Sequence, residues 1–317
     1  MHYPNGVGGI EKRRSTVKEG EIALTLTYIP TVSIIIPVLN AEREIGNLLD
    51  TIKKQAYPIS EIIVVDSGSE DRTVEICRKA ESVHLIEIER KDFDHGRTRD
   101  MAFRESKGEV VVFLTQDAIP ANEHFLERLI APLEDPKVAV STGRQIPKKN
   151  ATKMEKLVRL FNYPSDSNIR SKEDIPQLGI KTFFCSDVCA AYKRHVYLKL
   201  GGFDYPIRTN EDMFFAAKAI NAGYSVAYVG DAEVFHSHNF TLKQQYKRNY
   251  IQGYEIEKHR IALNNVEQKS EGIKLVKFVS KELLKHGELF SFIHFGLDCC
   301  ARLMGSRAGR KKARDNT

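Results

Sequence analysis

The hydrophobic pattern between residues 32 and 114 switches repeatedly from continuous apolar runs to helical spacing. The run Val32–Val38 predicts a strand buried on both faces. Asn40 is expected to cap the helix that follows, in which four apolar residues recur at helical spacing: Ile45, Leu48, Leu49 and Ile52. The same criteria predict strands at Glu61–Val65, Val83–Ile88 and Glu109–Leu114, and helices at Asp71–Ala80 and Gly96–Ser106. This alternation implies right-handed crossovers and an α/β fold with a mainly parallel sheet flanked by helices.

The second half of the chain has a more mixed pattern. It predicts further strands at Val138–Ser141, Val188–Tyr192 and Tyr224–Val229, and a helix at Asn210–Ala222. From Leu242 onward the pattern is mostly helical, with an apolar stripe that comprises Leu289, Ile293, Leu297, Cys300 and Met304. We therefore expect an N-terminal extension over residues 1–30, a sheet-forming domain over 31–240 and a helical appendix with a basic tail over 241–317.

Composition and charge indicate a globular, reduced protein and argue against a nucleic-acid binder. Hydrophobic residues make up 42% and charged residues 28% of the 317 positions, which is ordinary for a globular protein. The five cysteines form no even framework, which favours a reduced, cytoplasmic chain. The net charge of +6 is concentrated at the end, where residues 302–317 hold six basic side chains and one acidic one. A nearly neutral body argues against a nucleic-acid binder, whereas the tail fits an anionic membrane surface or a solubilising end.

The first and last segments raise the question of membrane contact. The start has no apolar segment behind its charges, so we expect no signal peptide, and no run approaches the roughly 20 apolar residues that span a bilayer. The stripe from Leu289 to Met304 could rest on the inner face of the cell membrane or pack on the sheet-forming domain. Both interpretations stay open at this stage.

Polar clusters follow three of the predicted strands. They cover Pro37–Glu42, Asp66–Asp71 and Thr115–Pro120, and ligands of open parallel sheets bind at such carboxyl ends. The carboxylate of Asp66 could accept hydrogen bonds from a base or a ribose, although Ser69 or Asp71 could simply cap the next helix. Asp117 could ligate a hard divalent cation together with substrate phosphates, although a single Asp after a strand is often a turn residue.

Two further clusters lie in the second half. Glu211 and Asp212 open a predicted helix, where they could serve the helix dipole or supply a general base for a hydroxyl nucleophile. His236 and His238 are two residues apart on an extended segment, so they point the same way and either could bind a metal. Paired histidines of this kind are more often structural or exposed.

At these residues the chain resembles the family 2 glycosyltransferases, inverting enzymes with a GT-A fold, and most closely their bacterial rhamnosyltransferase branch. The likeness runs from about Val32 to about Gly253 and rests on motifs in the expected order. These are Val32–Asn40, Val64–Thr73, Phe93–Arg99, Phe113–Ala118, Gly201–Asp204, Asn210–Asp212 and His236–His238.

The resemblance implies an inverting, metal-dependent glycosyltransferase. Asp212 would be the base for the acceptor hydroxyl, Asp117 and His236 would bind Mg2+ or Mn2+, and the donor of first choice is dTDP-rhamnose. The implied acceptor is a glycan or lipid-linked glycan, and nucleic acid is not an expected partner. The implied nucleotide-sugar site comprises Pro37, Val38, Asn40, Glu42, Asp66, Ser67, Gly68, Arg99, Gln116 and Asp117.

The pattern departs from the family at three points, and alternatives remain. Thr115 replaces the first acid of the Asp-x-Asp element, which weakens the metal assignment, and Asp100 stands where the family often has Asn. The Gln-x-x-Arg-Trp signature of processive synthases lacks its Trp after Arg248. A UDP-hexose donor or a degenerate, non-catalytic module that binds nucleotide sugars would be compatible with most of these motifs. A dinucleotide-binding dehydrogenase is not, because Pro37–Glu42 contains no glycine.

Overall fold

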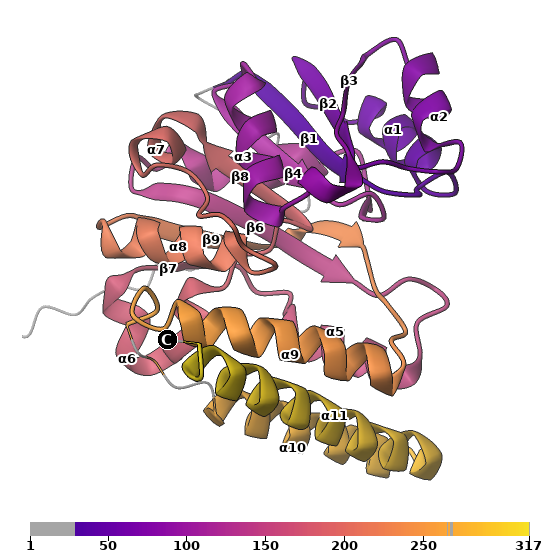
Figure 1. The fold of residues 1–317 in the computed structure, drawn as a ribbon, viewed down its shortest axis with the longest axis vertical. Helices are drawn as coiled ribbons and strands as arrows, with labels where there is room; N and C mark the ends of the chain where they lie inside the picture. Colours follow the sequence, from indigo (N-terminus) through magenta and orange to yellow (C-terminus); the bar gives the residue numbers. More distant parts are fainter. Residues whose placement is uncertain (1–28, 265, 267–268, 317) are drawn as a thin grey trace, which may run out of the picture.

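The computed structural model describes residues 29–264, 266 and 269–316, so nearly all of the predicted N-terminal extension lies outside the described residues. Within these residues, nine strands form one sheet in the order β3-β2-β1-β4-β8-β6-β9-β5, with β7 paired to β9 (Figure 1). The strands are β1 (Val32–Val38), β2 (Glu61–Asp66), β3 (Val83–Glu87), β4 (Val110–Leu114), β5 (Ile119–Pro120), β6 (Val138–Ile146), β7 (Asn168–Arg170), β8 (Cys189–Lys193) and β9 (Ser225–Phe235). The helices are α1 (Ile45–Lys53), α2 (Thr73–Lys79), α3 (His95–Glu105), α4 (Phe125–Ile130), α5 (Lys153–Asn162), α6 (Ile175–Leu178), α7 (Arg194–Lys199), α8 (Glu211–Asn221), α9 (Leu242–Lys258), α10 (Lys269–Lys285) and α11 (Leu289–Arg314).

The pairing of the strands divides the sheet into two parallel parts. Strands β1 to β4 pair in parallel, as the sequence predicts, and β6 pairs in parallel with β9. Strand β8 lies between the two parts and runs antiparallel to both β4 and β6. Because of this reversal, the first residues of β8 lie at the same edge of the sheet as the last residues of β4, with Cys189 opposite Leu114.

Helices cover both faces of the sheet, which explains the continuous apolar runs. In β1, Ile34 and Ile36 pack in a cluster with side chains of α1 and α4, whereas Ile35 packs in a second cluster with side chains of α3, α7 and α8. All three isoleucines are fully buried. The prediction that Val32–Val38 is a strand buried on both faces is therefore confirmed.

The sequence prediction for Asn40 is wrong. Helix α1 begins at Ile45, and the residue before it, Glu44, makes no side-chain cap. Asn40 lies four residues earlier in a left-handed conformation with φ of 48°, and its side-chain oxygen accepts a hydrogen bond from the backbone N–H of Glu70 at 2.9 Å. Asn tolerates positive φ better than most residues, so it connects the β1 and β2 loops instead of capping a helix.

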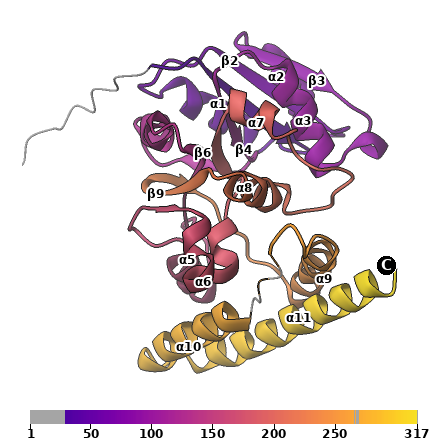
Figure 2. The same ribbon diagram turned by 90° about the vertical axis from the view of Figure 1, so that its left-hand side faces the viewer.

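The C-terminal helices form a separate layer away from the sheet, as both views show (Figures 1 and 2). Helix α11 approaches α9 so closely that a Cβ atom on Gly309 would lie 2.0 Å from the backbone oxygen of Tyr250, and one on Gly305 2.3 Å from that of Tyr246. A further apolar cluster joins α5, α10 and α11 through Met154, Val158, Val279, Leu283 and Phe295. Among the described residues, no helix has the length and apolarity needed to traverse a bilayer.

Candidate active site

The loops after β1 and β4 are joined at the carboxyl edge of the sheet. The side-chain oxygen of Gln116 accepts a hydrogen bond from the Leu39 backbone N–H at 2.8 Å, and its amide nitrogen donates to the Leu39 carbonyl at 3.2 Å. This pair of bonds holds the segment from Pro37 to Glu42 beside the residue that precedes Asp117. Two of the three predicted strand-end clusters therefore meet.

The third cluster is built around Asp66, whose side chain is buried at the end of β2. One carboxylate oxygen accepts hydrogen bonds from the backbone N–H groups of Gly68 at 3.0 Å and Ser69 at 2.9 Å, and the Ser69 hydroxyl also bonds to the carboxylate. Gly68 has φ of 80°, a conformation that side chains disfavour. Asp66 thus shapes its own turn, a role that its place at the end of a strand does not by itself indicate.

Most of the predicted nucleotide-sugar residues lie in this one region. The Ser69 hydroxyl accepts from the Asn40 backbone N–H at 2.8 Å, and Ser67 donates to the Val38 carbonyl at 3.2 Å. Glu42 accepts from Arg72 at 3.3 Å. Neighbouring pairs in the ladder place Pro37 beside Val65 and Val38 beside Asp66. The exception among the predicted residues is Arg99, which contacts a different set of side chains.

Asp117, His236 and His238 converge on one point. Opposite oxygens of the Asp117 carboxylate lie 3.5 Å from Nε2 of His236 and 3.4 Å from Nε2 of His238, and the candidate ligand atoms all lie within 4.8 Å of one another. Lys148 Nζ is 3.3 Å from the same carboxylate. Only His236 had been named as a ligand from the family resemblance, and His238 joins it because β9 ends in an extended segment that directs both rings to one side.

The residues around His236 fix the orientation, tautomer and charge of its imidazole ring. Its Nδ1 lies 2.9 Å from the side-chain oxygen of Gln145, an oxygen that Arg159 also contacts as a donor. The proton of the neutral ring is therefore on Nδ1, which leaves the Nε2 lone pair directed at Asp117 and His238. Burial lowers the pKa of His236 to about 3, so the imidazole is neutral at physiological pH. Burial alone would raise the pKa of Asp117, but His236, His238 and Lys148 outweigh it and the pKa is lowered.

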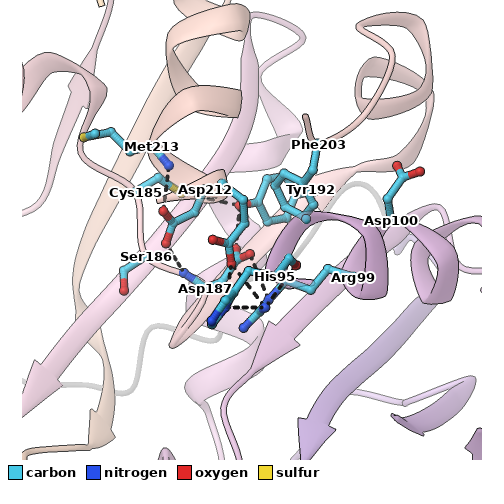
Figure 3. Close-up of polar contacts among 12 residues, drawn as sticks. His95, Arg99, Asp100, Cys185, Ser186, Asp187, Tyr192, Phe203, Asp212 and Met213 are labelled. Atoms are coloured by element: carbon cyan, nitrogen blue, oxygen red, sulfur yellow. Dashed lines mark hydrogen bonds and ion pairs between the residues drawn. The ribbon is translucent and has the colours of Figure 1, made fainter. Parts of the chain in front are cut away.

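Arg99 and three carboxylates form a second cluster between α3, β8 and α8 (Figure 3). Its Nε lies 3.4 Å from Asp187 and its Nη1 lies 3.2 Å from Glu211, and only 7% of the Arg99 side chain is exposed. His95 adds a ring nitrogen 3.8 Å from Glu211. The guanidinium holds together acidic groups that would otherwise repel one another in a buried position.

Asp212, at the start of α8, lies within this acidic cluster. One of its oxygens accepts a hydrogen bond from the Asp187 backbone N–H at 3.0 Å, and the other accepts from the Met213 N–H at 2.7 Å. Burial, reinforced by the charge of Glu211, raises the pKa of Asp212 to about 7. A carboxylate with a pKa in this range is suited to accept a proton near neutral pH.

Asp187 is a member of the site that sequence reasoning missed. It is 3% exposed, and the Tyr192 hydroxyl donates to it at 2.6 Å. Burial and the nearby Asp212 raise its pKa well above the usual range. The available signal is an acid just before the predicted strand Val188–Tyr192, whereas in a parallel sheet only the residues after strands are expected at the functional edge. Because β8 is antiparallel, its beginning lies at the functional edge.

A chain of contacts connects the two clusters. Gln145, which orients His236, donates to the hydroxyl of Ser186 at 2.9 Å, and Ser186 directly precedes Asp187. On the other side, Asp117 follows Gln116, which is bonded to the β1 loop. Hydrogen bonds and chain neighbours thus link three groups of residues: the turn at Asp66, the group around Asp117 and the cluster around Asp212.

Comparisons with known proteins identify the family. The chain matches the model described as "Glycosyl transferase family 2" over residues 33–201, more than half of its length, and it belongs to that family. The resemblance inferred from the motifs is confirmed, and the protein is a glycosyltransferase. It is 43% identical to the O-antigen chain rhamnosyltransferase RfbN of Salmonella typhimurium over 223 residues, which cover 70% of this chain and 71% of RfbN. The corresponding values for the O-antigen chain rhamnosyltransferase WbaN of Salmonella anatum are 40% identity over 227 residues, with 71% and 72% covered.

A solved structure supports the fold assignment. The mannosyltransferase PcManGT from Pyrobaculum calidifontis, in complex with GDP-Man and Mn2+, has a TM-score of 0.63 and 20% identity to this chain. The similarity covers 92% of this chain and 89% of the mannosyltransferase. The GT-A-like sheet with flanking helices, and the C-terminal helices that pack beside it, agree with the predicted fold.

Proposed function

We propose that this chain is an inverting rhamnosyltransferase that transfers rhamnose from dTDP-rhamnose to a hydroxyl group of a glycan or lipid-linked glycan. Two relatives at 40% identity or more are O-antigen chain rhamnosyltransferases, and the similarity extends over about 70% of both chains. The observation that carries the mechanistic part is Asp212, a partly buried carboxylate within the acidic cluster whose pKa is raised to about 7.

In the proposed reaction, the acceptor hydroxyl attacks the anomeric carbon of rhamnose while Asp212 accepts the hydroxyl proton. The bond between the anomeric carbon and the diphosphate oxygen breaks, dTDP leaves with the bonding electrons, and the anomeric configuration inverts. Asp66, Asn40 and Gln116 would position the nucleotide at the ends of β2, β1 and β4. Arg99 would keep the acidic cluster together so that Asp212 remains aligned.

The Asp117, His236 and His238 side chains are suited to hold a divalent cation. The fit rests on their convergence within 4.8 Å and on the orientation of His236 by Gln145. When bound, the cation would neutralise charge on the departing diphosphate. Two imidazole donors favour Mn2+ over Mg2+, because Mg2+ prefers oxygen ligands. The mannosyltransferase with a similar fold was solved with Mn2+.

The test compares donors by thermal shift and by turnover. We expect dTDP-rhamnose with MnCl2 to raise the melting temperature and EDTA to reverse the effect. A ligand that binds the folded protein at 100 times its Kd raises the free energy of unfolding by about 2.7 kcal/mol. With glycan or lipid-linked acceptors, release of dTDP should stop in Asp212→Asn. Release of UDP from a UDP-hexose instead would favour the alternative donor, and binding without turnover of any tested donor–acceptor pair would favour a non-catalytic module.

A further inference from the structure

The apolar stripe of α11 faces solvent. The exposed fractions are 60% for Leu289, 55% for Ile293, 52% for Leu297 and 62% for Met304, and Cys300 is also exposed. The residues of α11 that are buried against the rest of the protein lie on the opposite side of the helix: Phe295, Asp298, Gly305, Gly309 and Ala313. The interpretation that this stripe packs on the catalytic domain is therefore wrong.

Further exposed apolar side chains lie on α11 and on the neighbouring helix α10. Phe290 is 91% exposed and Leu303 51%, and the neighbouring helix α10 adds Ile273 at 56% and Leu284 at 55%. In both ribbon views α10 and α11 lie side by side in the layer farthest from the sheet (Figures 1 and 2). Large apolar residues grouped on one outer layer indicate an interaction surface, because single exposed apolar residues are normally scattered.

The charge of the same helices indicates the partner. Between Lys269 and Thr317 there are eleven basic residues and five acidic ones, a difference equal to the +6 net charge of the whole chain. The exposed side chains of Arg307 and Lys311 continue the stripe at helical spacing beyond Met304. An apolar stripe that runs into cations is typical of helices that lie in the interface of an anionic membrane.

We propose that the outer side of α10 and α11, centred on the stripe from Leu289 to Met304, docks on an anionic lipid bilayer. The apolar side chains enter the boundary between headgroups and acyl chains, and Arg307 and Lys311 contact anionic headgroups. A second copy of the chain fits this surface poorly, because a symmetric contact would bring two strongly positive surfaces together. The proposal uses only α10 and α11 and does not depend on the transfer reaction.

Vesicle flotation tests the proposal, with the full chain and without nucleotide or acceptor. We expect the protein to float with vesicles of phosphatidylcholine and phosphatidylglycerol and to bind pure phosphatidylcholine vesicles several-fold more weakly. Ile293→Glu should lower the partition coefficient on anionic vesicles roughly tenfold. The matched control is Ile169→Glu on β7, the same substitution at a residue that is also 55% exposed, and it should bind like the wild type. Raising NaCl from 0.1 to 0.5 M should weaken wild-type binding.

Three outcomes would overturn the proposal. The first is that the wild type does not float with anionic vesicles, and the second is that Ile293→Glu floats as efficiently as the wild type. The third is that light scattering shows a lipid-free dimer that Ile293→Glu converts to a monomer. The last outcome would assign the surface to a second copy. Equal melting temperatures of the two glutamate variants exclude unfolding as the cause of lost binding, and failure of vesicle binding leaves the donor and turnover assays unaffected.

Discussion

The raised pKa of Asp212 makes the pH dependence of transfer a direct test of its role as base. A base works only when ionised, so the rate should fall as the pH drops through about 7. With a pKa of about 7, roughly nine tenths of the side chains are ionised at pH 8 and one tenth at pH 6, so the rate should fall about tenfold over that range. Asp212→Asn should lower the rate by roughly 100- to 10,000-fold at pH 8.

The same pKa has a consequence for stability that does not depend on activity. The ordinary value is 3.8, so a shift of about three units corresponds to about 4 kcal/mol at most, and partial exposure reduces it to roughly 2 kcal/mol. Because the folded pKa is raised, this contribution to stability is fully present below pH 3.8 and is lost as the pH rises through about 7. The Asn variant does not ionise, so at pH 8 it should melt roughly 3 °C above the wild type.

The assay pairs initial rates of dTDP release from pH 5.5 to 8.5 with melting temperatures at pH 5 and pH 8. Asp50→Asn, an exposed carboxylate on α1, is the matched control and should change neither measurement. Glu211→Gln should move the acidic limb below pH 7, because it removes a neighbouring negative charge. An acidic limb centred near pH 4, or an Asn variant no more stable than the wild type at pH 8, would refute the reasoning.

Three further predictions concern the metal group, the helix packing and the acidic cluster. His236→Ala should weaken Mn2+ binding by at least about 100-fold in calorimetry, whereas His84→Ala, an exposed histidine on β3, should leave it unchanged. In urea unfolding, Gly309→Ala should lower the free energy of unfolding by about 1–3 kcal/mol, because its Cβ would meet a backbone oxygen of α9. Gly296→Ala, on the same helix but with open space around it, should raise the free energy of unfolding by about 0.5–1 kcal/mol. Arg99→Met should lower the free energy of unfolding by about 3–5 kcal/mol at pH 8 and by less at pH 5.5, because Asp187, whose pKa is raised by burial, is more readily protonated there. Equal losses at both pH values would contradict this.

The first half of the fold was predictable because its signal is local. A strand buried on both faces must be apolar at nearly every position, and Val110–Leu114 meets that condition throughout, as does Val32–Val38 apart from Ser33. The polar clusters that follow these strands also lie together, because parallel strands end at one edge. Sequence was therefore sufficient for the location of Asp66 and Asp117.

Other features depend on contacts between distant residues. An apolar run such as Val188–Tyr192 predicts a strand but not its direction, so the contribution of Asp187 to the site was missed. The grouping of Arg99 with Glu211 requires the packing of α3 against α8, which no spacing in the sequence expresses. The exposure of the α11 stripe was likewise undecided, because Gly305 and Gly309 on the opposite face, rather than larger apolar residues, make the contact with α9.

The late synthesis of β8, which pairs antiparallel with β4, also affects folding while the chain is being translated. Strand β4, with the sequence Val-Val-Val-Phe-Leu, pairs with β1 on one side, but its partner on the other side is synthesised only about 75 residues later. During that interval the growing polypeptide presents an apolar, unpaired strand edge, which is a template for aggregation. A chain released from the ribosome before Cys189 should therefore be insoluble even though its first four parallel strands are complete.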